Sequence, residues 1–207
     1  MTSTDVTRPT DLALDPAAQN LLFRDARTAS AFSDEAVTVE EFRAVHDLIK
    51  WGPTAMNTQP LRVVLVEPGP GRDRLVPLMS EGNRAKTVAA PLVAVLAADT
   101  RFHEHLPSIF PGRGEAVRDA MEDDAPGREA TALLSTGLQI GYFIIGVRAA
   151  GLAAGPMAGF DADAVSREFF PDGDHLARVV VNIGHAGPHS YRPRNPRLEF
   201  EQVYSVV

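Results

Sequence analysis

Two pairs of arginines stand near opposite ends of the chain, and their spacing suits the binding of a phosphate. Arg24 and Arg27 are three residues apart in a helical pattern, so they share one face beside Thr28. Arg192 and Arg194 flank a single proline. Guanidinium groups bind phosphate oxygens through paired, charge-assisted hydrogen bonds. A solvated helix face is an equally good interpretation of the first pair, because exposed arginines are common on protein surfaces.

A stiff loop over residues 51–60 offers a second kind of chemistry. Its sequence, WGPTAMNTQP, contains a glycine and two prolines that redirect or restrict the backbone, with small or amide side chains between them. The amides Asn57 and Gln59 can both donate and accept hydrogen bonds, which suits a flat polar ligand. The alternative is a connection that only turns the chain, the usual role of loops rich in proline and glycine.

Two further segments place polar or main-chain groups between expected elements. Asn83 and Lys86 precede an apolar strand pattern, a placement that is compatible with ligand contact but is also common at protein surfaces. Residues 155–161, with the sequence GPMAGFD, are expected to form a second rigid loop. Together with the arginine pairs and the loop over residues 51–60, these segments are where the polar groups of the chain cluster.

The elements that carry these segments alternate between helix and strand patterns. Thr38 and Glu41 form a capping box, so a helix begins there, and Asp15 and Asp161 are expected to cap two others. Helical patterns cover residues 15–27, 38–51, 71–79, 129–152 and 161–170, while strand patterns cover 61–67, 91–99 and 177–184. This order predicts an α+β or mixed-sheet fold.

The segment over residues 129–152 is apolar on nearly every side, which predicts a buried core helix that packs under a sheet or against a partner chain. Polar residues, among them Glu129 and Arg148, interrupt any run long enough to span a membrane. Three glycines along the segment cost helix stability and are expected to allow close backbone approach at a helix–helix interface. They are Gly137, Gly141 and Gly146.

The overall composition narrows the class of protein. With 207 residues, no cysteine and a net charge of −7, the chain is expected to be one domain over residues 1–207, without thiol chemistry or a nucleic-acid partner. Residues 1–14 are expected to be flexible and contain no signal-peptide core, so we expect a cytoplasmic protein. The motifs of Rossmann dinucleotide sites, P-loops and serine hydrolases do not occur in the sequence.

Two segments lack a regular pattern. Residues 100–127 mix aromatic, proline and acidic residues, and are expected to form a flexible, lid-like excursion over a site. His103 and His105 within this segment are potential metal ligands. The sequence indicates no third ligand, and we expect no metal site. Residues 186–207 end in apolar side chains with few neighbours, which favours packing against another subunit or a strand edge.

In their order and spacing these segments resemble the FMN-dependent nitroreductase family over about the whole chain, and most closely its malonic semialdehyde reductase-like branch from pyrimidine degradation. The motifs that carry the resemblance are FRDART over residues 23–28, KWGPT with Asn57 and Pro60, Gly82-Asn83 with Lys86, Ala90-Pro91, GPMAGFD, Asn182-Ile183-Gly184 and the arginine-rich run over residues 192–197.

The resemblance implies an α+β, three-layer sandwich in which helices flank a central, mainly antiparallel sheet. It also implies a homodimer that binds FMN at the subunit interface and exchanges the C-terminal extension over residues 186–207. The loop over residues 51–60 would then be a wall of the flavin site of the partner subunit.

The FMN contacts of the family map onto several segments of this chain. The matching residues are Arg27, Thr28, Pro53, Thr54, Ala55, Asn57, Asn83, Lys86, Pro156, Met157, Ala158, Gly159, Arg192 and Arg194. Among them, Lys86 would stabilise the negative charge of the reduced flavin. The chain departs from the common pattern at Ala26 and Ser30, where relatives carry basic residues, and at Ala158, where many carry glutamate.

By this resemblance the protein is expected to be an NAD(P)H-dependent FMN oxidoreductase of the nitroreductase type. Hydride would pass from NADH or NADPH through flavin N5 to a small acceptor in a ping-pong reaction, without a side-chain nucleophile. The expected acceptor is an aldehyde such as malonic semialdehyde, reduced to 3-hydroxypropionate, or else a nitroarene or quinone. The alternatives are a non-catalytic protein that binds or stores FMN and a metal hydrolase that uses His103 and His105.

Overall fold

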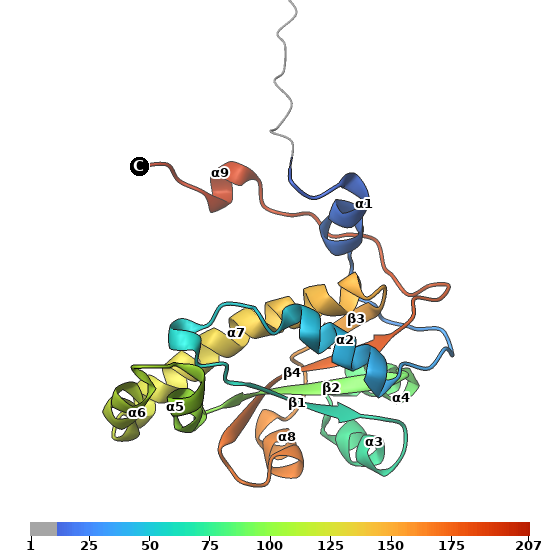
Figure 1. Ribbon diagram of the computed structural model, residues 1–207. Coiled ribbons are helices and arrows are strands. Elements are labelled where there is room, and N and C mark those ends of the chain that lie inside the picture. The colour runs from blue at the N-terminus through green and yellow to red at the C-terminus, as the bar shows by residue number, and fades with distance from the viewer. Residues whose placement is uncertain (1–11) are drawn as a thin grey trace, which may run out of the picture.

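A single four-stranded sheet forms the centre of the molecule in a computed structural model that describes residues 12–207 (Figure 1). In spatial order its strands are β1 (Leu61–Val66), β2 (Leu92–Asp99), β4 (His175–Gly184) and β3 (Ala153–Met157). All three pairings are antiparallel. The prediction that residues 1–14 are flexible falls mainly on residues 1–11, which lie outside the residues that the structure describes.

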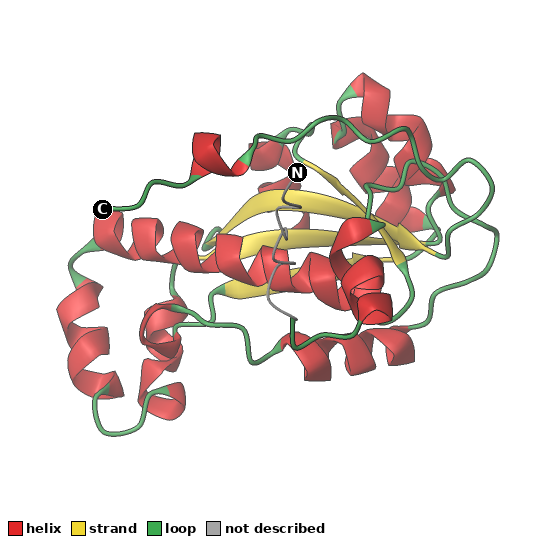
Figure 2. Cartoon of the chain, turned by 90° about the horizontal axis from the view of Figure 1, so that it is seen from above, coloured by secondary structure: helices red, strands yellow, loops and turns green. Residues whose placement is uncertain are grey.

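Strand β2 is buried along its whole length, and its alternating side chains divide the core into two faces. Leu92 and the alternate residues up to Leu96 join one apolar cluster, whereas Val93 and the alternate residues up to Ala97 join another. The first face is covered by α2 (Val39–Ile49) and α7 (Ala125–Ala149), and the second by α3 (Pro70–Leu75) and α8 (Ala162–Phe169). Helices therefore lie on both sides of the sheet, and the prediction of an α+β sandwich with a mainly antiparallel sheet is confirmed (Figures 1 and 2).

The predicted helix caps are confirmed. In the capping box of α2, the Glu41 N–H donates to Thr38 Oγ1 at 3.3 Å and the Thr38 N–H donates to Glu41 Oε2 at 2.6 Å. Asp15 and Asp161 each accept a hydrogen bond from the main-chain N–H three residues on, at 2.9 Å. The helix after Asp15 is nevertheless shorter and less regular than predicted, because α1 (Pro16–Gln19) continues only as a π-helical segment to Arg24.

Several short elements differ from the sequence-based expectation. Helix α4 (Glu81–Ala89) occupies a stretch for which only polar groups were expected, and β3 takes up the first half of the expected loop over residues 155–161. A Gly-Pro sequence argues against a strand, but β3 is an edge strand, where proline is tolerated. The remaining short helices are η2 (Ala55–Asn57), η3 (Val76–Leu78), η4 (Phe102–His105), α5 (Leu106–Ile109), α6 (Gly114–Glu122) and α9 (Phe200–Val203).

The segment over residues 100–127 is largely helical and packs against the core. Phe102 and Leu106 are completely buried, so hydrophobic burial fixes the start of this segment to the rest of the domain. The first two helices of this segment, η4 and α5, have four residues each and are too short to repeat an apolar pattern in the sequence. A lid-like role for the segment stays a prediction.

Helix α7 buries one face only. Ile140, Phe143 and Val147 pack into the core beside α2 and the sheet, whereas Leu134 is 67% exposed and Tyr142 lies on the same open side. The predicted packing of this helix on the sheet is therefore present on one side, and the other side is open in the single chain. By length and composition α7 would suffice to cross a membrane, but its buried side packs on the sheet, as in the core helix of a globular domain.

Gly146 is the glycine of α7 that the packing of this chain requires. A Cβ atom at position 146 would lie 2.2 Å from Ile49 Cγ2 and 3.3 Å from Val45 Cγ1, both in α2. The expected close helix–helix approach is thus present at Gly146, while an added Cβ at Gly137 or Gly141 meets no atom within 4 Å.

Gly146→Ala is expected to lower the free energy of unfolding by about 1–2 kcal/mol, because the overpacking of α2 against α7 exceeds the gain in helix propensity. Urea-induced unfolding followed by circular dichroism measures the difference. Gly137→Ala, in the same helix, is the matched control, because it adds the same methyl group without this clash. A Gly146→Ala variant as stable as Gly137→Ala would contradict the assignment.

Candidate functional site

A cavity of about 440 Å³ collects predicted site residues from both ends of the chain. Its walls come from the segment after α1, from α4, from β3 and from the C-terminal tail. The predicted residues that line it are Arg27, Thr28, Lys86, Pro156, Met157, Arg192 and Arg194. Among residues that were not in the predicted set, Ser30, Gly82 and Arg197 also line it.

The cavity is strongly cationic. Its lining includes the guanidinium groups of Arg27, Arg192, Arg194 and Arg197 and the ammonium group of Lys86. Within the described part of the chain, no carboxylate lines it. Because its charges are not neutralised in place, the cavity favours a ligand with a negative charge, and forked guanidinium groups match the oxygens of a phosphate.

The two arginine pairs are brought together by hydrogen bonds between the segment after α1 and the tail. Arg194 Nη2 donates to the carbonyl oxygens of Arg24 and Ala26, at 3.0 Å to the latter. Arg27 Nη1 donates to the Arg192 carbonyl at 3.4 Å. The Ser30 N–H donates to the Ser190 carbonyl at 2.8 Å. Arg24 thus contributes a main-chain acceptor to this contact, and its side chain is not part of the cavity lining.

Gly155 lets the segment after α1 approach β3. The Ala29 N–H donates to the Ala154 carbonyl at 2.9 Å, and a Cβ atom at position 155 would lie 2.5 Å from the Ala29 carbonyl oxygen. A side chain at this position would therefore separate the arginines of the first segment from Pro156 and Met157.

Asn83 joins α4 to the chain that follows β3. Its Nδ2 atom donates to the Gly159 carbonyl at 2.9 Å, and the Ser80 N–H donates to the same oxygen at 3.0 Å. Asn83, Ala158 and Gly159 are not among the lining residues, although Gly82 and Met157 are. Their predicted contact with FMN stays a prediction.

The loop over residues 51–60 is not part of this cavity within one chain, so Pro53, Thr54, Ala55 and Asn57 are separated from the other predicted residues. The loop is fixed on α7, where Ser135 Oγ accepts from the Ala55 N–H at 3.4 Å. The Asn57 side chain donates to the Ile109 carbonyl of α5 at 2.6 Å.

The backbone of this loop is unusual. Met56, Asn57 and Gln59 all have positive φ angles, between 43° and 56°. Such angles are uncommon for residues other than glycine, and they are maintained by the surrounding contacts. The loop therefore has a specific conformation fixed by tertiary contacts. Its contact with the flavin of a partner subunit stays a prediction.

His103 has a structural contact in place of a metal ligand set. It is completely buried, and its Nε2 atom lies 2.7 Å from Glu122 Oε2 at the end of α6. His105 is exposed and lies 3.9 Å from the Asp99 carboxylate. Among the residues that the structure describes, there is no group of three or more side chains able to hold a metal ion.

A model of the nitroreductase family matches residues 24–185, which is more than half of the chain. The chain belongs to the nitroreductase family. A Streptomyces coelicolor protein provisionally named NADH dehydrogenase/NAD(P)H nitroreductase is 56% identical over 196 residues, covering 95% of this chain and 99% of that relative. A Leptothrix cholodnii protein with the same provisional name is 49% identical, covering 94% of this chain and 98% of that relative. The predicted family is confirmed.

A solved nitroreductase from Exiguobacterium sibiricum, in complex with FMN, superposes with a TM-score of 0.82. The superposition covers 95% of this chain and 99% of that chain at 18% sequence identity, so this likeness concerns the nitroreductase fold alone. The sequence-based search for site residues missed Arg197, although it lies in the arginine-rich run that carried the family resemblance.

Glu122 offers a pH-dependent test of the contact with His103. The hydrogen bond from His103 lowers the pKa of Glu122 below the ordinary value of 4.5. Ionised Glu122 therefore stabilises the fold above about pH 4.5, and this contribution is lost as the pH falls through the lower folded-state pKa.

Glu122→Gln is expected to lower the melting temperature at pH 7, with a difference from the wild type that shrinks as the pH falls through the lowered folded-state pKa of Glu122. Thermal unfolding between pH 3 and pH 7 measures this trend. Glu115→Gln removes a carboxylate from the same helix and is the control. A difference that does not vary with pH would exclude a stabilising role of the ionised side chain.

Proposed function

We propose that this nitroreductase is an FMN-dependent oxidoreductase that takes electrons from NADH or NADPH. The observation that carries the proposal is the cationic cavity lined by arginines from both ends of the chain, by Lys86 and by the chain at Pro156 and Met157. The names of the curated relatives, which refer to NAD(P)H, and the FMN complex of the E. sibiricum nitroreductase support the same assignment. A solved Staphylococcus epidermidis protein of the same fold, named as an NAD(P)H:FMN oxidoreductase, agrees with it at a TM-score of 0.78.

The residues of the cavity fit FMN in charge. Arg27, Arg192 and Arg194 would hold the phosphate, and the hydroxyl group of Thr28 is available to donate to it. When bound, FMN supplies hydride transfer at its N5 atom. Lys86 would then stabilise the negative charge of the reduced state.

We propose that Asn83 and the segment Pro156, Met157, Ala158 and Gly159 border the flavin ring. The hydrogen bond from Asn83 to the Gly159 carbonyl supports this, because it holds the two segments together at one side of the cavity. Position 158 carries no ionisable group in this chain, so any polar contact there would come from the main chain.

We propose that the protein works as a homodimer and that the loop over residues 51–60 completes the flavin site of the partner. Exposed apolar side chains support this arrangement, because a chain in isolation rarely leaves so many in contact with water. They include Trp51, which is 80% exposed, together with Leu134, Leu138 and Tyr142 on the open side of α7. In such a dimer, Pro53, Thr54, Ala55 and Asn57 would reach the flavin of the other subunit.

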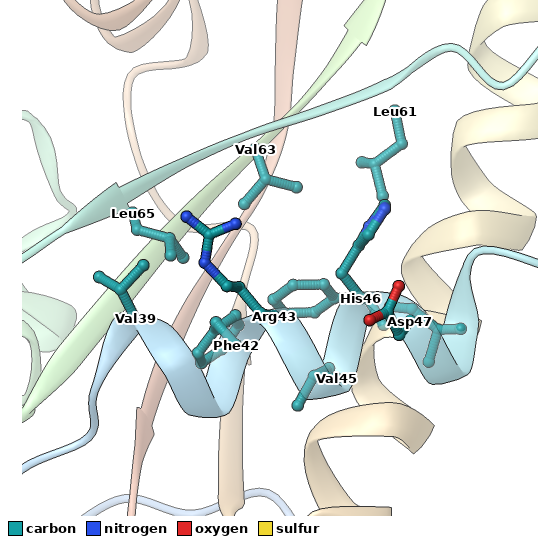
Figure 3. Close-up of a pocket in the computed structure, with 11 residues that line it drawn as sticks. Val39, Phe42, Arg43, Val45, His46, Asp47, Leu61, Val63 and Leu65 are labelled. Atoms are coloured by element: carbon teal, nitrogen blue, oxygen red, sulfur yellow. The ribbon is translucent and has the colours of Figure 1, made fainter.

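An apolar groove between α2 and β1 is suited to bind the tail of a second copy. The groove encloses about 470 Å³ and is lined mainly by apolar side chains of both elements (Figure 3). Phe143 of α7 also lines it. Among the residues that the structure describes, strand β1 lies at the edge of the sheet and pairs with β2 alone, so its other side is open to pairing. Phe200 and Tyr204 stack on one another in the tail and are both exposed. We propose that the tail of a second copy fills this groove.

The proposed reaction consists of two half-reactions that use the same site in turn, with a small acceptor in the second. The best candidate acceptor is an aldehyde such as malonic semialdehyde, which would give 3-hydroxypropionate, followed by a nitroarene or quinone. A purified protein that shows no flavin absorbance and takes up no FMN on reconstitution would overturn the proposed function. Bound FMN that neither nicotinamide cofactor reduces would instead indicate a storage protein.

Arg194→Ala is expected to weaken FMN binding by roughly tenfold to a hundredfold, since a charge-assisted contact contributes on the order of 1.5–3 kcal/mol. Riboflavin, which has no phosphate, should bind with little change. Fluorescence titration of the flavin-free protein with both ligands measures the difference. Arg178→Ala, at an exposed position on β4, removes a similar charge away from the cavity and is the control. Equal weakening for FMN and riboflavin would contradict a phosphate contact.

Deletion of residues 198–207 is expected to convert the dimer to a monomer at micromolar concentration, while it keeps every arginine of the cavity. Analytical ultracentrifugation of the full and shortened chains measures the change. Val63→Lys places a charge on the open edge strand in the groove, and it should also convert the dimer to a monomer. A shortened chain that dimerises as tightly as the full chain would show that the tail is not needed.

A further inference from the structure

Arg72 is a buried cation that is not part of the cavity lining. It lies on α3, is 4% exposed, and directs its hydrogen bonds to main-chain carbonyls rather than to a carboxylate. Nη1 donates to the carbonyls of Thr87 and Ala90 at 2.6 and 2.8 Å, and Nη2 donates to the Val66 carbonyl at 2.7 Å. Burial lowers the pKa of Arg72. A buried charge of this kind is costly, so its retention calls for a specific role.

The carbonyls that Arg72 binds belong to the end of α4 and to the end of β1. A helix leaves its last carbonyls without partners, and many helices supply these from the N–H groups that follow. Here Pro91 follows Ala90 and has no N–H to offer. Arg72 takes over this function, and its positive charge also suits the negative end of the helix dipole.

The last turn of α4 also carries Lys86, which precedes Thr87 in the sequence and lines the cationic cavity. Thr87 is completely buried, and its hydroxyl group donates to the Asn83 carbonyl at 3.0 Å. The first turn of α4 is fixed separately through Ser80 and Asn83 on Gly159. Without Arg72, the end of the helix that carries Lys86 would lose its anchor to β1.

We propose that Arg72 is a positioning residue that holds Lys86 at the wall of the cavity by fixing the last turn of α4. The inference rests on the proposed function, because it assigns to Lys86 a charge that favours the reduced flavin. Its chemical content is that the preference of the site for reduced over oxidised FMN depends on Arg72 through Lys86.

The test compares the midpoint potential of bound FMN in the wild type, Arg72→Met, Lys86→Met and the double variant. Lys86→Met is expected to lower the ratio of affinities for reduced and oxidised FMN about tenfold, ~30 mV for a two-electron couple. Arg72→Met should produce most of this change alone and less than a twofold further change beside Lys86→Met. Arg72→Lys, which keeps a donor and the charge, should restore most of the ratio. Fully additive effects would overturn the inference, because they would indicate a direct field of Arg72 on the flavin.

Leu75→Ala is the matched control for loss of stability. Leu75 lies on the same helix, is completely buried, and makes no hydrogen bond to α4 through its side chain. Leu75→Ala should lower the melting temperature, while the ratio of affinities for reduced and oxidised FMN stays within twofold of the wild type. A Leu75→Ala shift as large as that of Arg72→Met would overturn the inference. Arg72→Gln, which keeps an amide donor for one carbonyl, provides the comparison if Arg72→Met does not fold.

A second measurement does not need the flavin. In the flavin-free protein, amide hydrogen exchange over residues 86–90 should be at least tenfold faster in Arg72→Met and within threefold of the wild type in Leu75→Ala. Unchanged exchange in Arg72→Met would overturn the inference. A wild-type protein that binds no FMN would overturn the proposed function instead, and the exchange measurement would still test the anchoring of α4.

Discussion

Repulsion between like charges is the constraint on which the site of this nitroreductase depends. Four arginines and a lysine surround one cavity, and carboxylates would be the usual means of holding them there. The chain uses main-chain carbonyls instead, as in the contact of Arg194 with the segment after α1. A carbonyl oxygen satisfies a guanidinium donor without cancelling its charge. The cations are therefore held in place while their field remains available to an anionic ligand.

The sheet decides where this charge gathers. Strand β3 is an edge strand, and the absence of a side chain at Gly155 lets the segment after α1 hydrogen-bond beside it. The tail leaves β4, the neighbour of β3, and returns over the same segment, so arginines far apart in the sequence meet at one edge. On the opposite edge, β1 is open beside an apolar groove. One edge of the sheet thus carries the cationic cavity, and the opposite edge carries the apolar groove.

Much of the fold could be predicted because its strongest elements have strong local signals. The capping box at Thr38 and the apolar run of β2 each specify an element from a few neighbouring residues. Helix α4 was missed because its anchors, Arg72 and the Gly159 carbonyl, lie far away in the sequence. The open side of α7 could not be foreseen either, since apolar composition alone does not tell a core contact from a contact between chains.

For the candidate site, the sequence indicated Arg27, Lys86 and the pair of arginines in the tail as polar groups, but it could not show that they line one cavity. Their convergence depends on the order β1-β2-β4-β3, a long-range property that no local pattern encodes. Arg72 was invisible as a functional residue for the same reason, because only the tertiary structure places its side chain at the end of α4.

The position of β4 also bears on how the chain folds as it leaves the ribosome. This strand lies between β2 and β3, yet it is made after both of them. Until residues 175–184 emerge, β2 pairs on one side only and β3 has no neighbour in the sheet. A nascent chain therefore leaves one edge of its most apolar strand unpaired until β4 is made, and unpaired strand edges are prone to aggregate. The last strand to be synthesised is the one that closes the sheet.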